Sequence, residues 1–304
     1  VVSPIAVEVA QMAGFGVPFC VATVIGGAMF GDNLSFISDT TIAATSTQGC
    51  KMKDKFHVNF IIALPAALLA VAIITAISFA TEARAVAENS YSLVQLIPYV
   101  LVLALALTGI NVFTVLLVGI VAASIIMVAF GPLDMIGLLQ NIGKGISGMY
   151  ETILVAVLVS ALCGLIRIHG GFAALLDFIH KVFKGHRSGQ VGVGLLVSAL
   201  DIATANNTVA IVMAGPIAKQ MGDEYRISPK KTASLLDIFS CVVQGVLPYG
   251  AQMLVALAAI ASALPDARVS AFDLIPYMFY PFLLLISVLV FIAISPRKNK
   301  NLEV

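Results

Sequence analysis

The amino-acid sequence predicts an all-α polytopic membrane protein. Of its 304 residues, 60% are hydrophobic and only 11% are charged, and the mean hydropathy is +1.04. Soluble domains are about 45–50% apolar and about 25% charged, so this composition excludes an ordinary soluble enzyme. Long runs without a charged residue recur along the chain, and a helix needs about 20 such residues to cross a bilayer.

The charges and cysteines exclude several other classes of protein. The net charge is +1 and no basic cluster is interleaved with aromatic residues, so we expect no nucleic-acid partner. The cysteines lack the spacing of a disulfide framework or a zinc site, because they stand singly at Cys20, Cys50, Cys163 and Cys241. We therefore expect the lipid bilayer as the main partner and no cofactor.

Uninterrupted apolar runs locate the ordinary crossings in chain order. Residues 58–81 form one helix, residues 89–133 are long enough for two that turn at 108–111, and residues 146–166 and 274–295 form one each. Residues 172–184 are expected to form an amphipathic segment on the cytoplasmic surface.

Three further apolar segments contain polar and helix-breaking residues. They are residues 9–47, 191–218 and 233–263. Such breaks at membrane depth are tolerated only where protein or a water-filled cavity satisfies the freed backbone groups. We therefore predict that the first and third are broken helices that line a site.

The distribution of Lys and Arg decides whether residues 191–218 form a crossing or a re-entrant hairpin. With a hairpin, 14 basic residues lie on the cytoplasmic side, Lys51, Lys53 and Lys55 among them, and 3 lie outside; with a crossing the division is 9 against 8. Since cytoplasmic loops are rich in Lys and Arg, the hairpin is predicted. Its arms of about ten residues would each extend about 15 Å.

In this topology the two broken helices run in opposite directions, which indicates inverted repeats with the substrate site between them. Residues 1–92 would be the C-terminal part of the first repeat and residues 93–304 the second repeat. The second repeat would contain scaffold helices 93–168, the amphipathic segment 172–184, the hairpin 191–218, the broken helix 233–263 and the last span 274–295. We expect the matching hairpin of the first repeat to precede Val1, in a longer chain of which this sequence is an N-terminally truncated piece.

The break in the first broken helix carries the strongest chemical signal. Carboxylate and hydroxyl oxygens suit a small hard cation such as Na⁺, and a carboxylate that holds either a cation or a proton has the minimal chemistry of an antiporter. We expect Na⁺ at Asp39 and Asp32, with Asp39 lying deeper, because intramembrane acids are costly and usually functional. The alternative is a hydrophilic loop outside the membrane. The candidate ligands are Asp39, Asp32, Ser35, Ser38, Thr40 and Thr41.

Two other polar groups are expected to complete the cavity. One is the hairpin tip, and the other is a single face of the second broken helix. The alternatives are that the tip residues cap helices and that the face makes hydrogen bonds between helices. The residues are Asp201, Thr204, Asn206, Asn207 and Thr208 at the tip, with Asp237, Ser240 and Gln244 on the helix.

Residues 26–41 resemble the NhaC family of Na⁺/H⁺ antiporters. Their Gly-Ala, Phe-Gly-Asp, Ser and Ser-Asp-Thr-Thr groups have the spacing of that family. A looser resemblance covers most of the chain, including Asp237 and the break at Leu247-Pro248-Tyr249, where the family commonly has Pro-Trp. The resemblance implies an ion-transporter fold with inverted repeats and elevator-like alternating access.

These observations predict a secondary transporter, not an enzyme, that exchanges Na⁺ for H⁺ across the bacterial cytoplasmic membrane. Na⁺ and H⁺ are then transported ligands rather than cofactors. The alternative is a Na⁺- or H⁺-coupled carrier of an amino acid or organic acid, with the anion held by the hairpin tip. A membrane protein without flux is a third class, and a homodimer is left open as the assembly.

Overall fold

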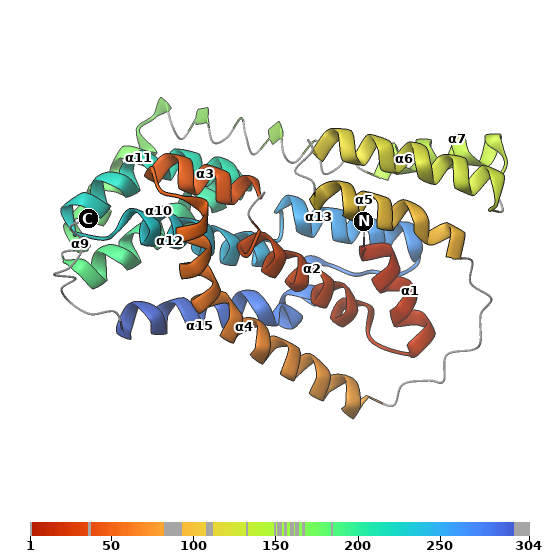
Figure 1. Cartoon of the computed structure of the whole chain (residues 1–304), viewed down its shortest axis with the longest axis horizontal. Helices are drawn as coiled ribbons and strands as arrows, with labels where there is room; N and C mark the ends of the chain where they lie inside the picture. Colours follow the sequence, from red (N-terminus) through yellow and green to blue (C-terminus); the bar gives the residue numbers. More distant parts are fainter. Residues whose placement is uncertain are drawn as a thin grey trace. The chain divides into compact units, whose positions relative to one another are not determined.

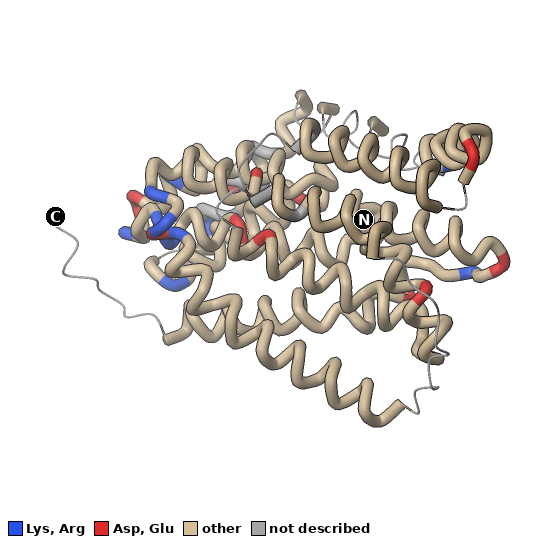
Figure 2. Tube along the Cα trace, turned by 45° about the vertical axis from the view of Figure 1, so that its right-hand side comes forward, with Lys and Arg blue, Asp and Glu red and all other residues tan. Residues whose placement is uncertain are grey.

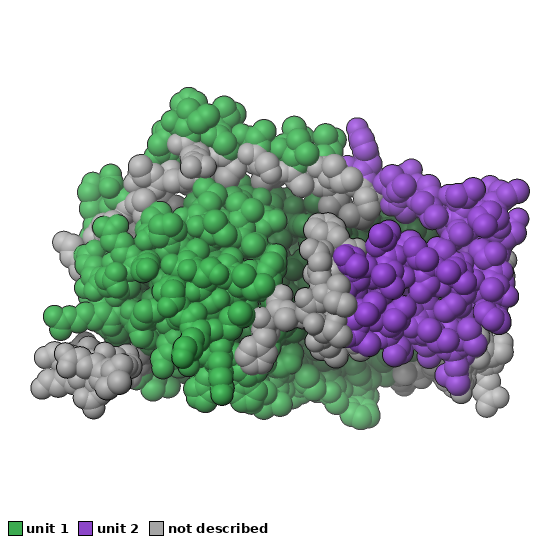
Figure 3. All heavy atoms as spheres, turned by 45° about the horizontal axis from the view of Figure 1, so that its top comes forward, with its two compact units in different colours: residues 1–85, 151–304 green, residues 86–150 purple. Residues whose placement is uncertain are grey.

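The computed structural model describes residues 2–35, 38–81, 93–107, 112–131, 133–148, 150, 154, 157–158, 161, 164–165, 168–183 and 185–294. Every regular element in these ranges is a helix (Figure 1), which confirms the all-α prediction. The chain divides into two compact units, residues 86–150 and residues 1–85 with 151–304 (Figure 3). Every candidate site residue belongs to the larger unit.

The smaller unit contains the 3₁₀ helix η1 (Leu93–Leu96) and the helices α5 (Ile97–Leu107), α6 (Val112–Ala129) and α7 (Met135–Gly148). Helix α6 packs on both α5 and α7. Two helices therefore lie in the segment predicted to hold two, although the turn predicted at 108–111 lies outside the described residues. Most of the span predicted at 146–166 also lies outside them.

The first broken helix consists of α2 (Val17–Asn33) and α3 (Asp39–Gln48), and a separate helix α1 (Ser3–Ala13) precedes it. The prediction that the broken helix begins at residue 9 is wrong. Gly14 ends α1 in the left-handed conformation, with φ 78°, and Pro18 stands in the first turn of α2, where its missing N–H costs no helical hydrogen bond. The break between α2 and α3 falls where the sequence predicts it.

Helix α4 (Met52–Ala80) contains 29 residues, so it is about 44 Å long. By length and composition α4 can cross a membrane, and so can α12 and α13 taken together over Pro229–Ala263. The last helices are α14 (Ala271–Leu274), η2 (Ile275–Tyr277) and α15 (Phe279–Ile294), which bend by 52° and form a third candidate span if the bent pair counts as one. The sequence predicts the span at 274–295 without this bend.

The predicted hairpin consists of α10 (His186–Thr204) and α11 (Asn207–Glu224), which pack on each other. Helix α9 (Gly171–Val182) precedes it, where an amphipathic segment is predicted. The arms contain 19 and 18 residues, so they extend about 28 Å rather than the 15 Å predicted. The prediction counted only the apolar part of each arm, whereas both helices continue through polar residues such as Gln190 and Lys219.

The second broken helix consists of α12 (Pro229–Val246) and α13 (Ala251–Ala263), separated by a break that contains Pro248. It runs antiparallel to α2. A Cβ on Gly245 would lie 2.5 Å from the sulfur of Met29, whereas Cys241, one turn earlier, contacts Asn33, one turn later. The opposite directions predicted for the two broken helices are therefore present.

The packing around these helices is reciprocal (Figure 1). Helix α1 packs on α2 and α13, while α11 packs on α12 and α3. Likewise α15 packs on α2, α4 packs on α12, and α4 and α15 pack on each other. Lys and Arg of the larger unit gather mainly at one end (Figure 2), as the predicted topology requires.

Candidate ion-binding site

Asp32 lies in the last turn of α2 and faces the hydroxyls of the break. Ser38 donates a hydrogen bond to Asp32 Oδ1, and Thr40 Oγ1 donates to Asp32 Oδ2 over 3.3 Å. The two hydroxyls are themselves 2.6 Å apart. Two hydroxyls at the start of α3 therefore converge on the half-buried carboxylate at the end of α2. Ser35 follows in the break, where its backbone N–H donates to the Asp32 carbonyl.

Asp39 is the first residue of α3 and is exposed. The prediction that it lies deeper than Asp32 is wrong, because α3 begins at Asp39 and directs it to the open side of the break. Thr208, the second residue of α11, donates a hydrogen bond of 2.6 Å to Asp39 Oδ2. The N-termini of α3 and α11 thus meet at this carboxylate.

Behind the break, Lys55 and Asp237 form a buried ion pair. The distance from Lys55 Nζ to Asp237 Oδ2 is 2.7 Å, and each side chain is 1% exposed. Lys55 Nζ also donates to Thr41 Oγ1 over 2.6 Å. The prediction that Lys55 is a cytoplasmic loop charge is wrong, because the residue is buried in the first turns of α4, on the face that packs on α12. Without it the predicted charge division is 13 against 3.

Asn59 extends this ion pair into a network across four helices. Its Nδ2 donates to Asp237 Oδ2 over 2.7 Å and to the carbonyl of Asn33 over 2.9 Å, while Ser234 donates to its Oδ1. Asn33 in turn donates to Tyr280 Oη on α15 over 3.1 Å. The network joins α2, α4, α12 and α15.

Lys55 and Asn59 are the functional candidates that the sequence reasoning missed. A signal for them exists, because they lie four residues apart on the stripe that Ile62, Ala66 and Ala70 continue into the core. The surrounding charges Lys51, Lys53 and Asp54 concealed it, since they make the start of α4 resemble a solvated loop.

The predicted face of the second broken helix does not enter one cavity. Asp237 points to α4, and Ser240 donates to the carbonyl of Asp237 within its own helix over 3.0 Å. Gln244 Nε2 donates to the Ala205 carbonyl at the hairpin tip over 3.4 Å. The alternative of hydrogen bonding between helices therefore describes Asp237 and Gln244.

Most polar residues of the hairpin tip cap their own helices. Thr204 Oγ1 donates to the Leu200 and Asn206 carbonyls, and Asn206 Oδ1 accepts from the backbone N–H of Val209 over 3.0 Å. Asn207 Oδ1 accepts from the N–H of Thr208. The capping alternative is the one seen, and Thr208 is the tip residue that reaches the first broken helix. Asp201 lies one turn before the tip and is fully buried.

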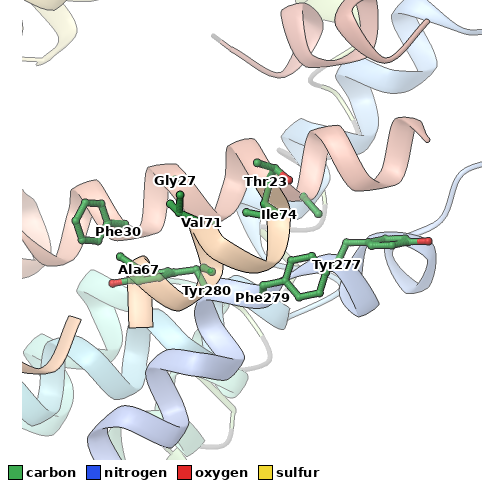
Figure 4. Close-up of a pocket in the computed structure, with 12 residues that line it drawn as sticks. Thr23, Gly27, Phe30, Ala67, Val71, Ile74, Tyr277, Phe279 and Tyr280 are labelled. Carbon is green, nitrogen blue, oxygen red and sulfur yellow. The ribbon is translucent and has the colours of Figure 1, made fainter. Parts of the chain in front are cut away.

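A cavity of about 190 Å³ lies between α2, α4 and the residues around Tyr277 to Tyr280 (Figure 4). Its lining is apolar apart from a few hydroxyls, with Gly27, Phe30, Ala67 and Val71 among its walls. It contains no carboxylate, so it does not suit a cation. Nor do three His, Cys, Asp or Glu side chains cluster anywhere within the described ranges as metal ligands.

Comparisons with known proteins found similar sequences. A family model described as "Na+/H+ antiporter family" matches residues 1–82 and 79–295. The Na(+)/H(+) antiporter NhaC of Bacillus subtilis (strain 168) is 26% identical over 320 aligned residues, which cover 93% of this chain and 68% of that protein. No solved structure matches the chain.

Proposed function

The chain belongs to the Na⁺/H⁺ antiporter family, and we propose that it binds the ions it exchanges at the break between α2 and α3. It is a multi-pass transporter of the bacterial cell membrane rather than an enzyme, and Na⁺/H⁺ exchange is its activity. The proposal concerns which residues hold the ions.

One observation carries the proposal. Of the carboxylates around the break, Asp237 already has a cation within 2.7 Å, namely Lys55. Asp32 and Asp39 have only hydroxyl and N–H partners among the described residues. These two carboxylates therefore need a cation from solution, and either Na⁺ or a proton neutralises them.

The hydroxyls supply the rest of the ligand set. Ser38 and Thr40 already contact Asp32, and a hydroxyl oxygen keeps lone pairs for a cation after it has donated its proton. Ser35 and Thr41 are the further candidate oxygens. Because Asp32 lies within electrostatic range of Asp39, Asp237 and Lys55, a cation at the break acts on all four groups.

Alternating access follows from the same arrangement. The reciprocal packing of α1, α2 and α3 with α13, α12 and α11 supports the inverted repeat. An empty site would expose ionised carboxylates to a low-dielectric surrounding, which is costly. Loading with Na⁺ or H⁺ lowers that cost and lets the site-bearing helices move.

The test is Na⁺-driven proton flux in liposomes that contain the purified chain. Asp32→Asn and Asp39→Asn are expected to abolish the flux, since a neutral amide binds neither ion well. Asp223→Asn, which changes an exposed acid on α11, serves as the matched control and should retain it. Undiminished exchange in Asp39→Asn and Asp32→Asn would refute the proposed site.

A second candidate is a cation-coupled carrier of an amino acid or organic acid. One observation favours it, because the N-termini of α3 and α11 meet at Asp39 and Thr208, and such termini attract anionic groups. Uptake of labelled amino acids that is lost in Asn206→Ala and Asn207→Ala would support this carrier. Asn206 already caps α11, so the folding of that variant needs a separate measurement.

A further inference from the structure

Asp201 is a buried acid that the proposed ion site does not use. It lies in the last turn of α10 and is fully buried. Neither of its carboxyl oxygens has a hydrogen-bond partner in the described part of the chain. By contrast, each oxygen of Asp32 accepts a hydrogen bond.

A third unpartnered oxygen belongs to the side chain of Gln244. The backbone of Gln244 on α12 approaches the Asp201 carboxyl without reaching the distance and angle of a hydrogen bond, and the Gln244 side chain reaches the hairpin tip, where its Nε2 donates to the Ala205 carbonyl. Its Oε1 is buried without a partner among the residues described. Three side-chain oxygens of α10 and α12 thus lack a hydrogen-bond partner among the described residues.

No counter-charge is paired with Asp201 in the ranges that the structure describes. Helix α10 packs on α9, α11, α12 and α15, and Tyr249, after α12, is the ionisable group of the described residues within electrostatic range of Asp201. The Tyr249 hydroxyl donates to the Ile202 carbonyl over 2.7 Å. The other ionisable side chains described on the packing helices are Asp177, Lys181, Lys219, Asp223, Glu224, Lys230, Lys231, Asp237, Cys241 and Tyr280.

Electrostatics disfavour a bare carboxylate at this position. The C-terminal end of a helix carries partial negative charge, so the dipole of α10 opposes an anion in its last turn. Removal of an unpaired charge from water is also costly. A proton removes both difficulties, because it neutralises Asp201 and converts one acceptor into a donor that the amide oxygen of Gln244 can accept. A metal ion would need more oxygen ligands than these.

We propose that Asp201 is a second proton-binding group, which shares its proton with Gln244 and is separate from the site on the α2–α3 break. The sequence predicts Asp201 in the same cavity as Asp39. In the structure the charged surroundings of the two sites differ. Asp32 lies within electrostatic range of Asp39, Asp237 and Lys55, whereas Asp201 has no charged neighbour within such range in the described part of the chain. Na⁺ at the break therefore does not displace the proton on Asp201.

The test is infrared spectroscopy of the purified full chain in lipid at neutral pH. A protonated carboxyl has a C=O stretching band that carboxylates and amides lack. We expect Asp201→Asn to remove one such band and Asp223→Asn to leave it. Addition of Na⁺ should leave the band unchanged as well. Identical spectra for wild type and Asp201→Asn, or loss of the band on addition of Na⁺, would overturn the proposal.

A second variant keeps the test decisive if Asp201→Asn fails to fold. Gln244→Leu retains Asp201 but removes the amide oxygen, so the band should move to higher frequency; an unmoved band would contradict the shared proton. The inference is independent of the proposed ion site. Asp39→Asn should lose exchange and keep the band, so the failure of either proposal is recognised separately.

Discussion

Asp237 and Asp201 are buried to the same degree on neighbouring helices, yet their surroundings differ. Asp237 has Lys55 and Asn59 on one oxygen at 2.7 Å each, and these partners belong to a network across four helices. Asp201 has no partner on either oxygen within the described chain. The carboxylate of Asp237 is neutralised by Lys55, whereas that of Asp201 depends on a proton from solution.

The difference between Asp237 and Asp201 indicates two uses of acidic residues in a protein with few charges. An acid with an internal cation can hold helices in place without a ligand from solution. An acid without one is sensitive to the ions around it, because its charge must be neutralised by a ligand. Asp39, which is exposed, and Asp32, which is half-buried, are intermediate. Hydroxyls donate to both carboxylates, but neither forms an ion pair with a described residue.

Replacement of Lys55 is expected to have the largest effect on stability. Lys55→Met leaves Asp237 buried without a cation, and loss of one partner of a buried pair typically costs about 3–5 kcal/mol. We expect a large fall in the midpoint of thermal unfolding in detergent. Lys53→Met, an exposed lysine two residues earlier, is the matched control. Equal melting of both variants would show that the ion pair does not stabilise the fold.

A double variant tests whether the stability lost in Lys55→Met is due to the unpaired charge of Asp237. Lys55→Met combined with Asp237→Leu replaces the two charges by apolar groups of similar size. Such replacements of buried pairs are often neutral or stabilising, so much of the lost stability should return. No recovery would mean that Lys55 acts mainly through Thr41.

Removal of Asn59 is expected to have an intermediate effect. Asn59→Ala deletes the donor to Asp237 and to the Asn33 carbonyl, both buried, and an unsatisfied buried group costs about 1–3 kcal/mol. The midpoint of thermal unfolding should fall less than in Lys55→Met. His57→Ala, on the exposed side of α4, provides the control, and a similar fall in both variants would remove Asn59 from the network.

Asp201→Asn should have the smallest effect on stability. It removes no side-chain hydrogen bond or ion pair that Asp201 makes with another described residue, and an amide matches the protonated acid in shape and neutrality. We expect a change below about 1 kcal/mol in the free energy of unfolding. A loss as large as that of Lys55→Met would show that Asp201 has a structural partner, and the contrast between the two acids would then disappear.

Much of the fold could be predicted from the sequence because helix breaks are local. Gly14, Pro18 and Pro248 end or begin helices through their own backbone chemistry, and charge-free runs reveal the spans. The 9–47 boundary was wrong because both its helices are apolar, so only Gly14 and Pro18 separate them. The arm lengths of the hairpin were wrong because helices continue through polar residues.

The candidate site was harder to predict because partners are distant in sequence. Asp32, Ser38 and Thr40 are close together in the chain and were found. Lys55 and Asp237 are 182 residues apart, and nothing local distinguishes Lys55 from Lys53 except its place on the buried stripe. The same holds for Ser240 and Gln244, which share a helix face but make contacts with different neighbours.

The sequence by itself determined that this protein is a helical membrane transporter with polar breaks, because composition, period and helix-breaking residues act locally. Only the tertiary structure decided which carboxylate is neutralised from within and which is not. The physical reason is that the state of a buried charge depends on the few atoms within about 4 Å, and the packing of α2, α4, α10 and α12 places those atoms.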